Sequence, residues 1–196
     1  LTRLTENIGH YSFENAQKLS AIADAHGMEL KEHNGDYLPD GILLMHPALG
    51  VSSSNVAPEF GVDETRSYIE LAKLEEKLYD IGVVAQKGNL LPVLRKCAVE
   101  TGRWRKWMVG DTASFSVERV LADDQLTGVI TDVSGHYTFE LPPVAAEIEG
   151  LLDRLEAARV PARRYVIDKI KRSIGKYVTA YNLRGLTTRL RRYAGK

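Results

Sequence analysis

The chain has 196 residues, of which 44% are hydrophobic and 27% are charged. This is the composition of an ordinary folded protein, and it excludes collagen-like, disordered and disulfide-stapled classes. The 26 basic side chains cancel the 26 acidic ones overall. Residues 151–196 nevertheless hold 13 basic and 3 acidic side chains, net +10, which leaves −10 for residues 1–150. The neutral total therefore combines two oppositely charged parts.

The only cysteine, Cys97, cannot form an intramolecular disulfide, and no cysteine and histidine cluster has zinc-finger spacing. No apolar run approaches the roughly 18 residues of a membrane span, and the first residues show neither the basic nor the apolar region of a secretory signal. These features predict a cytoplasmic protein that does not contact a membrane. The sequence begins at Leu1 rather than methionine, and we expect a missing N-terminal part.

Helix and strand patterns alternate over residues 12–80. In chain order, the spacing of apolar residues, glycines and prolines predicts a helix over residues 12–26, a strand over 28–32, a helix over 41–46, a strand over 50–56 and a helix over 63–78. This alternation is typical of a parallel sheet, in a β/α barrel or a doubly wound fold. Neither strand is followed by a glycine-rich phosphate-binding motif, so no nucleotide cofactor is expected.

The remainder of the chain has a predominantly helical pattern. Helices are predicted over residues 90–100, 117–122, 144–158 and 163–177, and the end of the chain is basic. No internal repeat is visible.

Polar side chains gather after the first predicted strand, where Glu32, His33, Asp36 and Tyr37 fall within six residues. Active sites of parallel α/β folds lie at the carboxyl ends of strands, so these residues are candidates for acid-base chemistry or for a divalent metal. The same spacing also suits a turn in which Asp36 caps the next helix and His33 bonds to the backbone, and the spacing alone favours this second interpretation.

A second cluster, Asn55 with Glu59, follows the second predicted strand. It would lie beside the first cluster if the two strands are neighbours. We discount phosphate binding at the following helix, because Asp63 and Glu64 at its start would repel the phosphate.

Two basic regions raise the question of nucleic acid. Residues 104–107 alternate tryptophan with arginine and lysine, and residues 163–192 carry a further series of basic side chains. Basic stems packed over indole rings, and charge complementation within the fold or within an oligomer, are the commoner explanations of such patterns. Nucleic-acid binding through the basic C-terminus is therefore kept only as a remote alternative.

One stretch of the chain resembles a known family. The segment Glu32-His33-Asn34-Gly35-Asp36-Tyr37-Leu38, the segment Asn55-Val56-Ala57-Pro58-Glu59-Phe60-Gly61 and the helix that starts at Asp63 resemble the Z-subunit family of class II tagatose-bisphosphate aldolases. That family has also been described as a tagatose 6-phosphate kinase. The chain differs from the better-known aldolase subunits at Asn34-Gly35, where those have Ser-Thr.

The resemblance implies a fold and a division into domains. It implies the C-terminal part of a TIM-type β/α barrel with additional C-terminal helices. Residues 1–85 would supply the last strands and helices of the barrel, and residues 86–196 a mainly helical extension packed on it. A closed barrel needs about 250 residues, so this chain alone could not close one.

The resemblance also implies a function in the catabolism of galactitol, tagatose or related sugars. The first hypothesis is a non-catalytic subunit that stabilises a catalytic class II aldolase partner. The second is a metal-dependent 4-epimerase that acts on a phosphorylated ketose by retro-aldol cleavage, and a kinase is disfavoured. A homo-oligomer is the alternative to the aldolase partner.

The expected roles follow the matched motif residue by residue. Glu32, Glu59 and Asp36 are the expected catalytic residues, and His33, Tyr37 and Asn55 the expected substrate-binding ones. Glu32 and His33 are candidate ligands of Zn, Mn or Ni.

Overall fold

The computed structural model describes residues 2–3, 6–7, 10–108 and 110–195. It is 70% helical. The principal helices are α1 (Phe13–Ala25), α2 (Asp40–Met45), α3 (Pro58–Asp80), α4 (Leu90–Glu100), α5 (Val117–Leu121), α6 (Asp124–Ser134), α7 (Pro142–Ala157), α8 (Ala162–Ala180) and α9 (Leu186–Tyr193). Short 3-10 helices are η1 (Pro47–Leu49), η2 (Arg103–Trp107), η3 (Gly110–Ser114) and η4 (Gly135–Thr138). None of the described helices is long and apolar enough to cross a membrane.

The strands are short and few. β3 (Leu30–Glu32) and β4 (Val51–Ser54) form a two-stranded parallel sheet, and β1 (Thr2–Arg3) pairs antiparallel with β2 (Glu6–Asn7). A β/α barrel needs eight parallel strands. The expected TIM-type barrel is therefore wrong for this structure, because the parallel sheet in its described residues stops at two strands and the chain after β4 continues as helices.

Most of the predicted helices are present, with shifted ends. Ser12 caps α1 by accepting a hydrogen bond from the Asn15 N–H at 3.2 Å, and Gly27 follows the helix with φ of +64°. α3 begins at Pro58, five residues before the predicted start, because proline suits the first position of a helix. α6 was not predicted at all.

The chain divides into two compact units. Unit 1 comprises residues 1–57 and 171–196, and unit 2 comprises residues 58–170. The division falls inside α8, so the first part of that helix belongs to unit 2 and its last part to unit 1.

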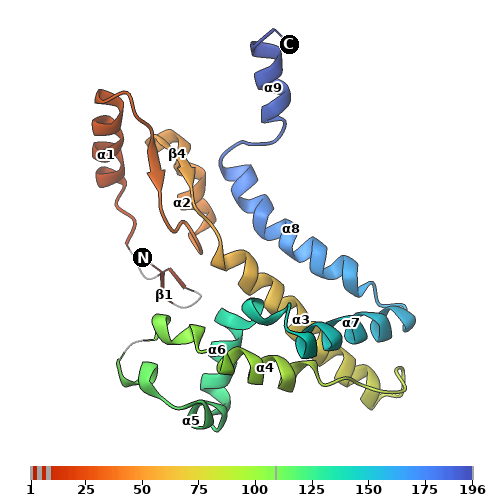
Figure 1. The fold of residues 1–196 in the computed structure, drawn as a ribbon. Coiled ribbons are helices and arrows are strands. Elements are labelled where there is room, and N and C mark those ends of the chain that lie inside the picture. The colour runs from red at the N-terminus through yellow and green to blue at the C-terminus, as the bar shows by residue number, and fades with distance from the viewer. Residues whose placement is uncertain (1, 4–5, 8–9, 109, 196) are drawn as a thin grey trace. The chain divides into compact units, whose positions relative to one another are not determined.

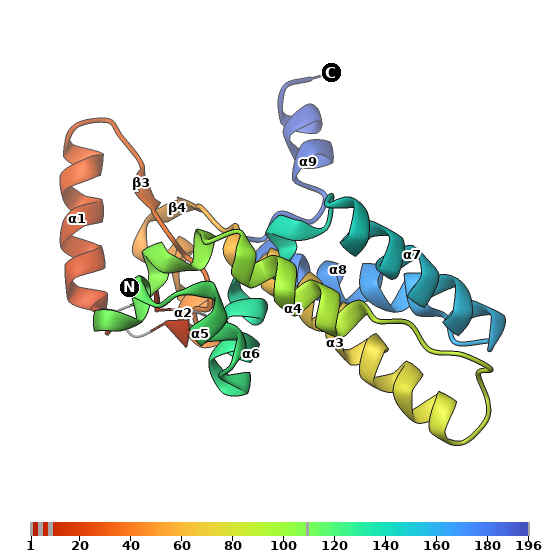
Figure 2. The same ribbon diagram turned by 60° about the horizontal axis from the view of Figure 1, so that its bottom comes forward.

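Unit 2 is built around α4. Figure 2 shows the helices α3, α4, α7 and α8. The main apolar core of unit 2 joins α3, α4, α7 and the start of α8, and includes Leu71, Leu94, Leu151 and Val166. A second apolar cluster surrounds Trp104, which is fully buried and donates from Nε1 to the Val99 carbonyl at 2.9 Å. A buried ion pair joins Arg154 Nε to Glu75 Oε1 at 2.6 Å.

Unit 1 contains α1, β3, α2, η1 and β4 (Figure 1). It also contains the last turns of α8 and the whole of α9. The crossover from β3 to β4 runs through α2 and η1, and Gly50 closes it with φ of +77°. Buried apolar side chains inside the unit include Leu38, Leu43 and Val51. This small βαβ element sets the position of the strand ends.

Candidate functional site

The carboxyl ends of β3 and β4 lie side by side in unit 1. Glu32 is in register with Ser54. The Asn55 N–H donates to the Glu32 carbonyl at 3.1 Å, and the Gly35 N–H donates to the Asn55 carbonyl at 2.9 Å. The structure thus brings Glu32 and Asn55, predicted from separate motifs, to one edge of the sheet.

Glu32, His46 and Tyr181 form a row of neighbouring polar side chains in unit 1. His46, which directly follows α2, is fully buried, and its Nε2 lies 3.2 Å from Glu32 Oε2. The hydroxyl of Tyr181 lies 3.2 Å from His46 Nδ1. A histidine protonated on Nε2 would accept from Tyr181 at Nδ1, but His46 Nε2 and Glu32 Oε2 form no hydrogen bond with any described residue. The ring of Tyr11 packs 5.2 Å from the His46 ring, measured between centroids.

Burial shifts the pKa values of four neighbouring side chains in the direction that favours the neutral form: Glu32, His46, Tyr11 and Tyr181. Burial raises the pKa of the Glu32 carboxyl and lowers the pKa of His46. Burial also raises the pKa of Tyr11 and the pKa of Tyr181, and the nearby Glu32 carboxylate adds to both shifts. A carboxyl group whose charged form is disfavoured is suited to exchange a proton with a bound hydroxyl.

A cavity of about 310 Å³ opens beside Glu32. The start of α1 supplies the polar side chains of Tyr11, Ser12 and Asn15, and the strands and the loop after β3 supply Leu30, Leu38 and Val51. Lys31 and His33 line the same cavity and are exposed. Its size is at the lower end of the range for small-molecule sites, so it suits a small polar ligand rather than a nucleotide.

Asp36, Tyr37 and Asn55 have mainly structural contacts. Asp36 is only 1% exposed, and its Oδ1 accepts the Ala57 N–H at 3.1 Å. Tyr37 is half-buried, with φ of +58° in the turn. The side chain of Asn55 is exposed, and its backbone carries the bonds between the strand ends. Asp36 thus binds backbone at Ala57, and the expected cap of the next helix is wrong, because α2 has Pro39 at its N-cap and no side-chain cap hydrogen bond.

Glu59 lies in the first turn of α3 and belongs to unit 2, where it is 7% exposed. A joint role of Glu59 with Glu32 stays a prediction.

A divalent metal such as zinc needs three or four protein ligands close together. Nowhere in the described residues do three or more His, Cys, Asp or Glu side chains sit where they could hold a metal ion. Glu32 and His46 offer one oxygen and one nitrogen, fewer than the three or four protein ligands of typical zinc sites. His33, the expected second ligand, is exposed. The donor set of the described residues therefore does not fit a metal.

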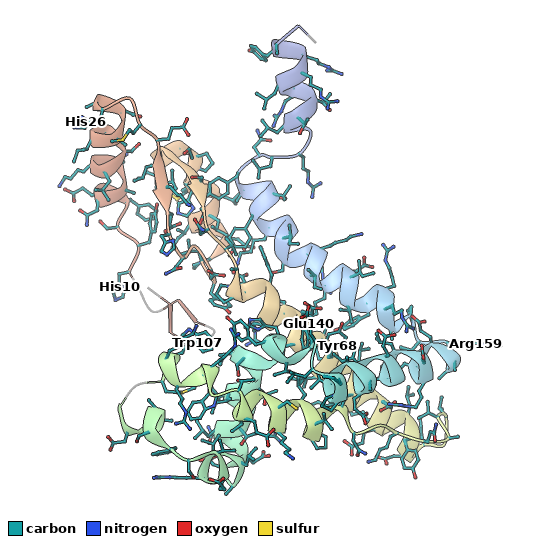
Figure 3. The ribbon with its side chains drawn as sticks, viewed as in Figure 1. His10, His26, Tyr68, Trp107, Glu140 and Arg159 are labelled. Atoms are coloured by element: carbon teal, nitrogen blue, oxygen red, sulfur yellow. The ribbon has the colours of Figure 1, made fainter. Side chains whose placement is uncertain are left out.

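The aromatic and basic stretch in unit 2 has its ring faces covered by its own cations. Arg105 lies over the Trp104 ring, Lys106 over Trp107 and Arg103 over Tyr137, at 4.6, 4.5 and 4.7 Å from the ring centroids. Trp107, labelled in Figure 3, also stacks on Tyr137. These contacts leave little free ring surface for stacking on a nucleobase.

Sequence reasoning missed His46, Tyr181 and Tyr11. His46 stands alone before Pro47 and shares no motif with the other two. Tyr181 follows His46 by 135 residues, so only the folded chain brings them together.

Comparison with family models, with curated proteins and with solved structures found no match for this chain.

Proposed function

We propose that this chain acts in the catabolism of phosphorylated ketoses of the galactitol and tagatose type, as a stabilising subunit of a class II tagatose-bisphosphate aldolase. The observation that supports this proposal is the parallel pairing of β3 and β4, which sets the motif residues Glu32 and Asn55 at one edge. The cavity beside that edge has carboxylate, amide and hydroxyl groups for sugar hydroxyls, and Lys31 on its rim offers a charge for a phosphate.

The test adds the purified chain to a catalytic class II tagatose-bisphosphate aldolase and measures how long aldolase activity survives heating. The chain should lengthen the half-life of the aldolase while showing no turnover by itself. An equal amount of an unrelated helical protein is the control for nonspecific protection. An unchanged half-life would contradict the accessory role.

The Glu32–His46 pair favours a second candidate, a ketose-phosphate 4-epimerase that works by retro-aldol cleavage. Glu32 takes the proton from the C4 hydroxyl as the C3–C4 bond breaks, which yields an enediolate and an aldehyde. The aldehyde turns, the bond re-forms on its other face, and the proton returns to the C4 oxygen. His46 Nε2 lies 3.2 Å from the carboxylate of Glu32, which lines the cavity.

This second function is tested with tagatose 6-phosphate or fructose 6-phosphate, first without added metal and then with Mn, Zn or Ni, with inversion at C4 followed by NMR. The expected result is turnover that Glu32→Gln abolishes. His26→Gln, at an exposed histidine outside the cavity lining, is the control and should retain the activity. No inversion in any of these assays, with or without metal, would exclude the epimerase.

A further inference from the structure

The basic side chains at the start of α8 are paired with acids of unit 2. Arg163 reaches Glu149, Asp153 and Glu156, each at 2.8 Å. Lys169 contacts Glu70 at 2.5 Å. The positive charge of this part of α8 is therefore neutralised within its own unit.

The pairing ends where α8 passes into unit 1. Residues 171–196 contain eight basic and no acidic side chains. Six of these cations form no ion pair with any described residue: Lys171, Arg172, Arg184, Arg189, Arg191 and Arg192. This end of the chain carries a concentrated and uncompensated positive charge.

The same end exposes an apolar stripe. Leu186, Leu190 and Tyr193 lie on α9 at spacings of four and three residues, which places them on one helix face. They are 37%, 59% and 95% exposed, and Leu183, three residues before Leu186, is 45% exposed. No residue of α9 is buried. An isolated helix of this length is marginal in water, so a surface that covers the stripe would stabilise it.

Charge and apolar surface together indicate the kind of surface that residues 183–193, here termed the C-terminal arm, would fit. RNA phosphates would pair with the arginines, but the leucines would stay exposed to water. An acidic protein surface with exposed apolar side chains would pair with the arginines and also cover the apolar stripe. Because residues 171–196 carry +8 and the whole chain is neutral, residues 1–170 carry −8. A second copy of this chain therefore offers the complementary charge.

Residues 1–170 also expose apolar side chains close in sequence to acids. Ile22 and Met28 are 58% and 60% exposed, and the nearby Asp24 and Glu29 are exposed as well. We propose that the C-terminal arm docks on the acidic part of a second copy, so that the chain self-associates through its arginines and its apolar stripe.

The experiment is sedimentation of the 196-residue chain over a wide range of protein concentration, at low and at high salt. We expect reversible self-association that weakens as salt rises, since salt screens exposed charges. Replacing Arg189, Arg191 and Arg192 together by Gln should raise the dissociation constant by about tenfold. Leu190→Ser should also raise it, through loss of apolar contact.

The matched control removes the same charge elsewhere, with Lys73, Lys77 and Arg159 together replaced by Gln. These three side chains are exposed on unit 2, and this variant should associate like the parent. A chain that stays monomeric at every concentration would overturn the proposal, as would association that the arginine variant leaves intact. Binding of a monomeric chain to RNA or to anionic phospholipid vesicles through the same arginines would assign another partner and also overturn it.

Discussion

The two units differ in the extent of their apolar cores. Unit 2 buries a large apolar core that includes Leu94 and Leu151, both fully inaccessible to solvent. Unit 1 buries fewer apolar side chains and leaves that of Leu19 on α1 about half exposed. Both units also bury polar groups, but Glu75 in unit 2 is paired with Arg154, whereas His46 Nε2 in unit 1 has no hydrogen-bond partner among the described residues. A polar group in the interior costs stability unless it is paired. The comparison assigns most of the stability to unit 2 and the candidate chemistry to unit 1.

Substitutions that remove side-chain volume should give the largest difference between the units in the free energy of unfolding. Leu94→Ala leaves a cavity at a fully buried position and should lower the free energy of unfolding by about 2–5 kcal/mol. Leu19→Ala, at a side chain that is 53% exposed, should change it by less than about 0.5 kcal/mol. Urea unfolding measures both. Equal losses would mean that α1 is as well packed as α4.

Crowding at the strand ends should give the next largest effect. A Cβ added at Gly35 would lie 2.0 Å from Ser54 Oγ and 3.4 Å from Glu32 Oε2. Gly35→Ala should therefore destabilise unit 1 by about 1–3 kcal/mol, because the core around it must shift. Ser54→Ala removes the clashing hydroxyl, so the double variant should recover part of the loss in the same unfolding assay. Additive losses in the double variant would show that the two sites do not touch.

Substitution of a helix cap should give a smaller difference in stability between the two units. Asp123 caps α6 in unit 2 by accepting the Leu126 N–H at 2.9 Å, and Asp123→Ala should cost about 0.5–2 kcal/mol of global stability. Ser12→Ala removes the corresponding bond of α1 in unit 1. There we expect local fraying, seen as faster amide exchange in α1, with little change in global unfolding. A global loss from Ser12→Ala as large as that from Asp123→Ala would show that α1 unfolds together with unit 2.

The smallest expected effect is on the pH dependence of stability. Because the folded-state pKa of His46 is below its ordinary value of 6.5, the unfolded chain binds the proton more readily, and stability should fall as the pH drops below 6.5. Glu32 acts in the opposite sense, since its raised pKa favours the folded state below 4.5 and that advantage is lost as pH rises. His46→Gln should remove the loss just below pH 6.5.

The control for this prediction is His26→Gln. His26 is exposed at the end of α1, where Figure 3 labels it, so its replacement removes one histidine and leaves His46 and its contacts in place. Thermal unfolding monitored across this pH range measures both variants. An unchanged slope in His46→Gln would mean that His46 does not titrate on unfolding.

Local patterns predicted local structure well. The cap at Ser12, the strand that ends at Glu32 and the helix over 90–100 are all confirmed, because each depends on residues a few positions apart. α6 was missed because its threonines and valines favour strands in isolation. Here Thr127, Thr131 and Ser134 donate their hydroxyls to carbonyls of the same region, which satisfies these polar groups inside the core. Tertiary packing overrode propensity in this helix.

Long-range features were predicted less well. The barrel was inferred from a resemblance, and nothing in the strand patterns themselves required more than two parallel strands. Of the candidate site, the sequence identified Glu32 and Asn55 but missed His46 and Tyr181, whose contact depends on the last turns of α8. Phe13 and Ile22 belong to the apolar spacing that predicted α1, yet they are 42% and 58% exposed. Periodicity identifies a helix face but not what covers it.

The split of unit 1 between two separate segments sets an order of assembly during synthesis. Unit 2 is a continuous segment, and it lies between the segment that contains Glu32 and His46 and the segment that contains Tyr181. Because the chain is made from its N-terminal side, Glu32 and His46 are synthesised before unit 2, and Tyr181 is synthesised after it. Domains fold as their residues become available. The contact between His46 and Tyr181 is therefore completed only after all residues of unit 2 have been made, and a nascent chain truncated before Tyr181 would leave His46 Nδ1 without this hydrogen-bond partner.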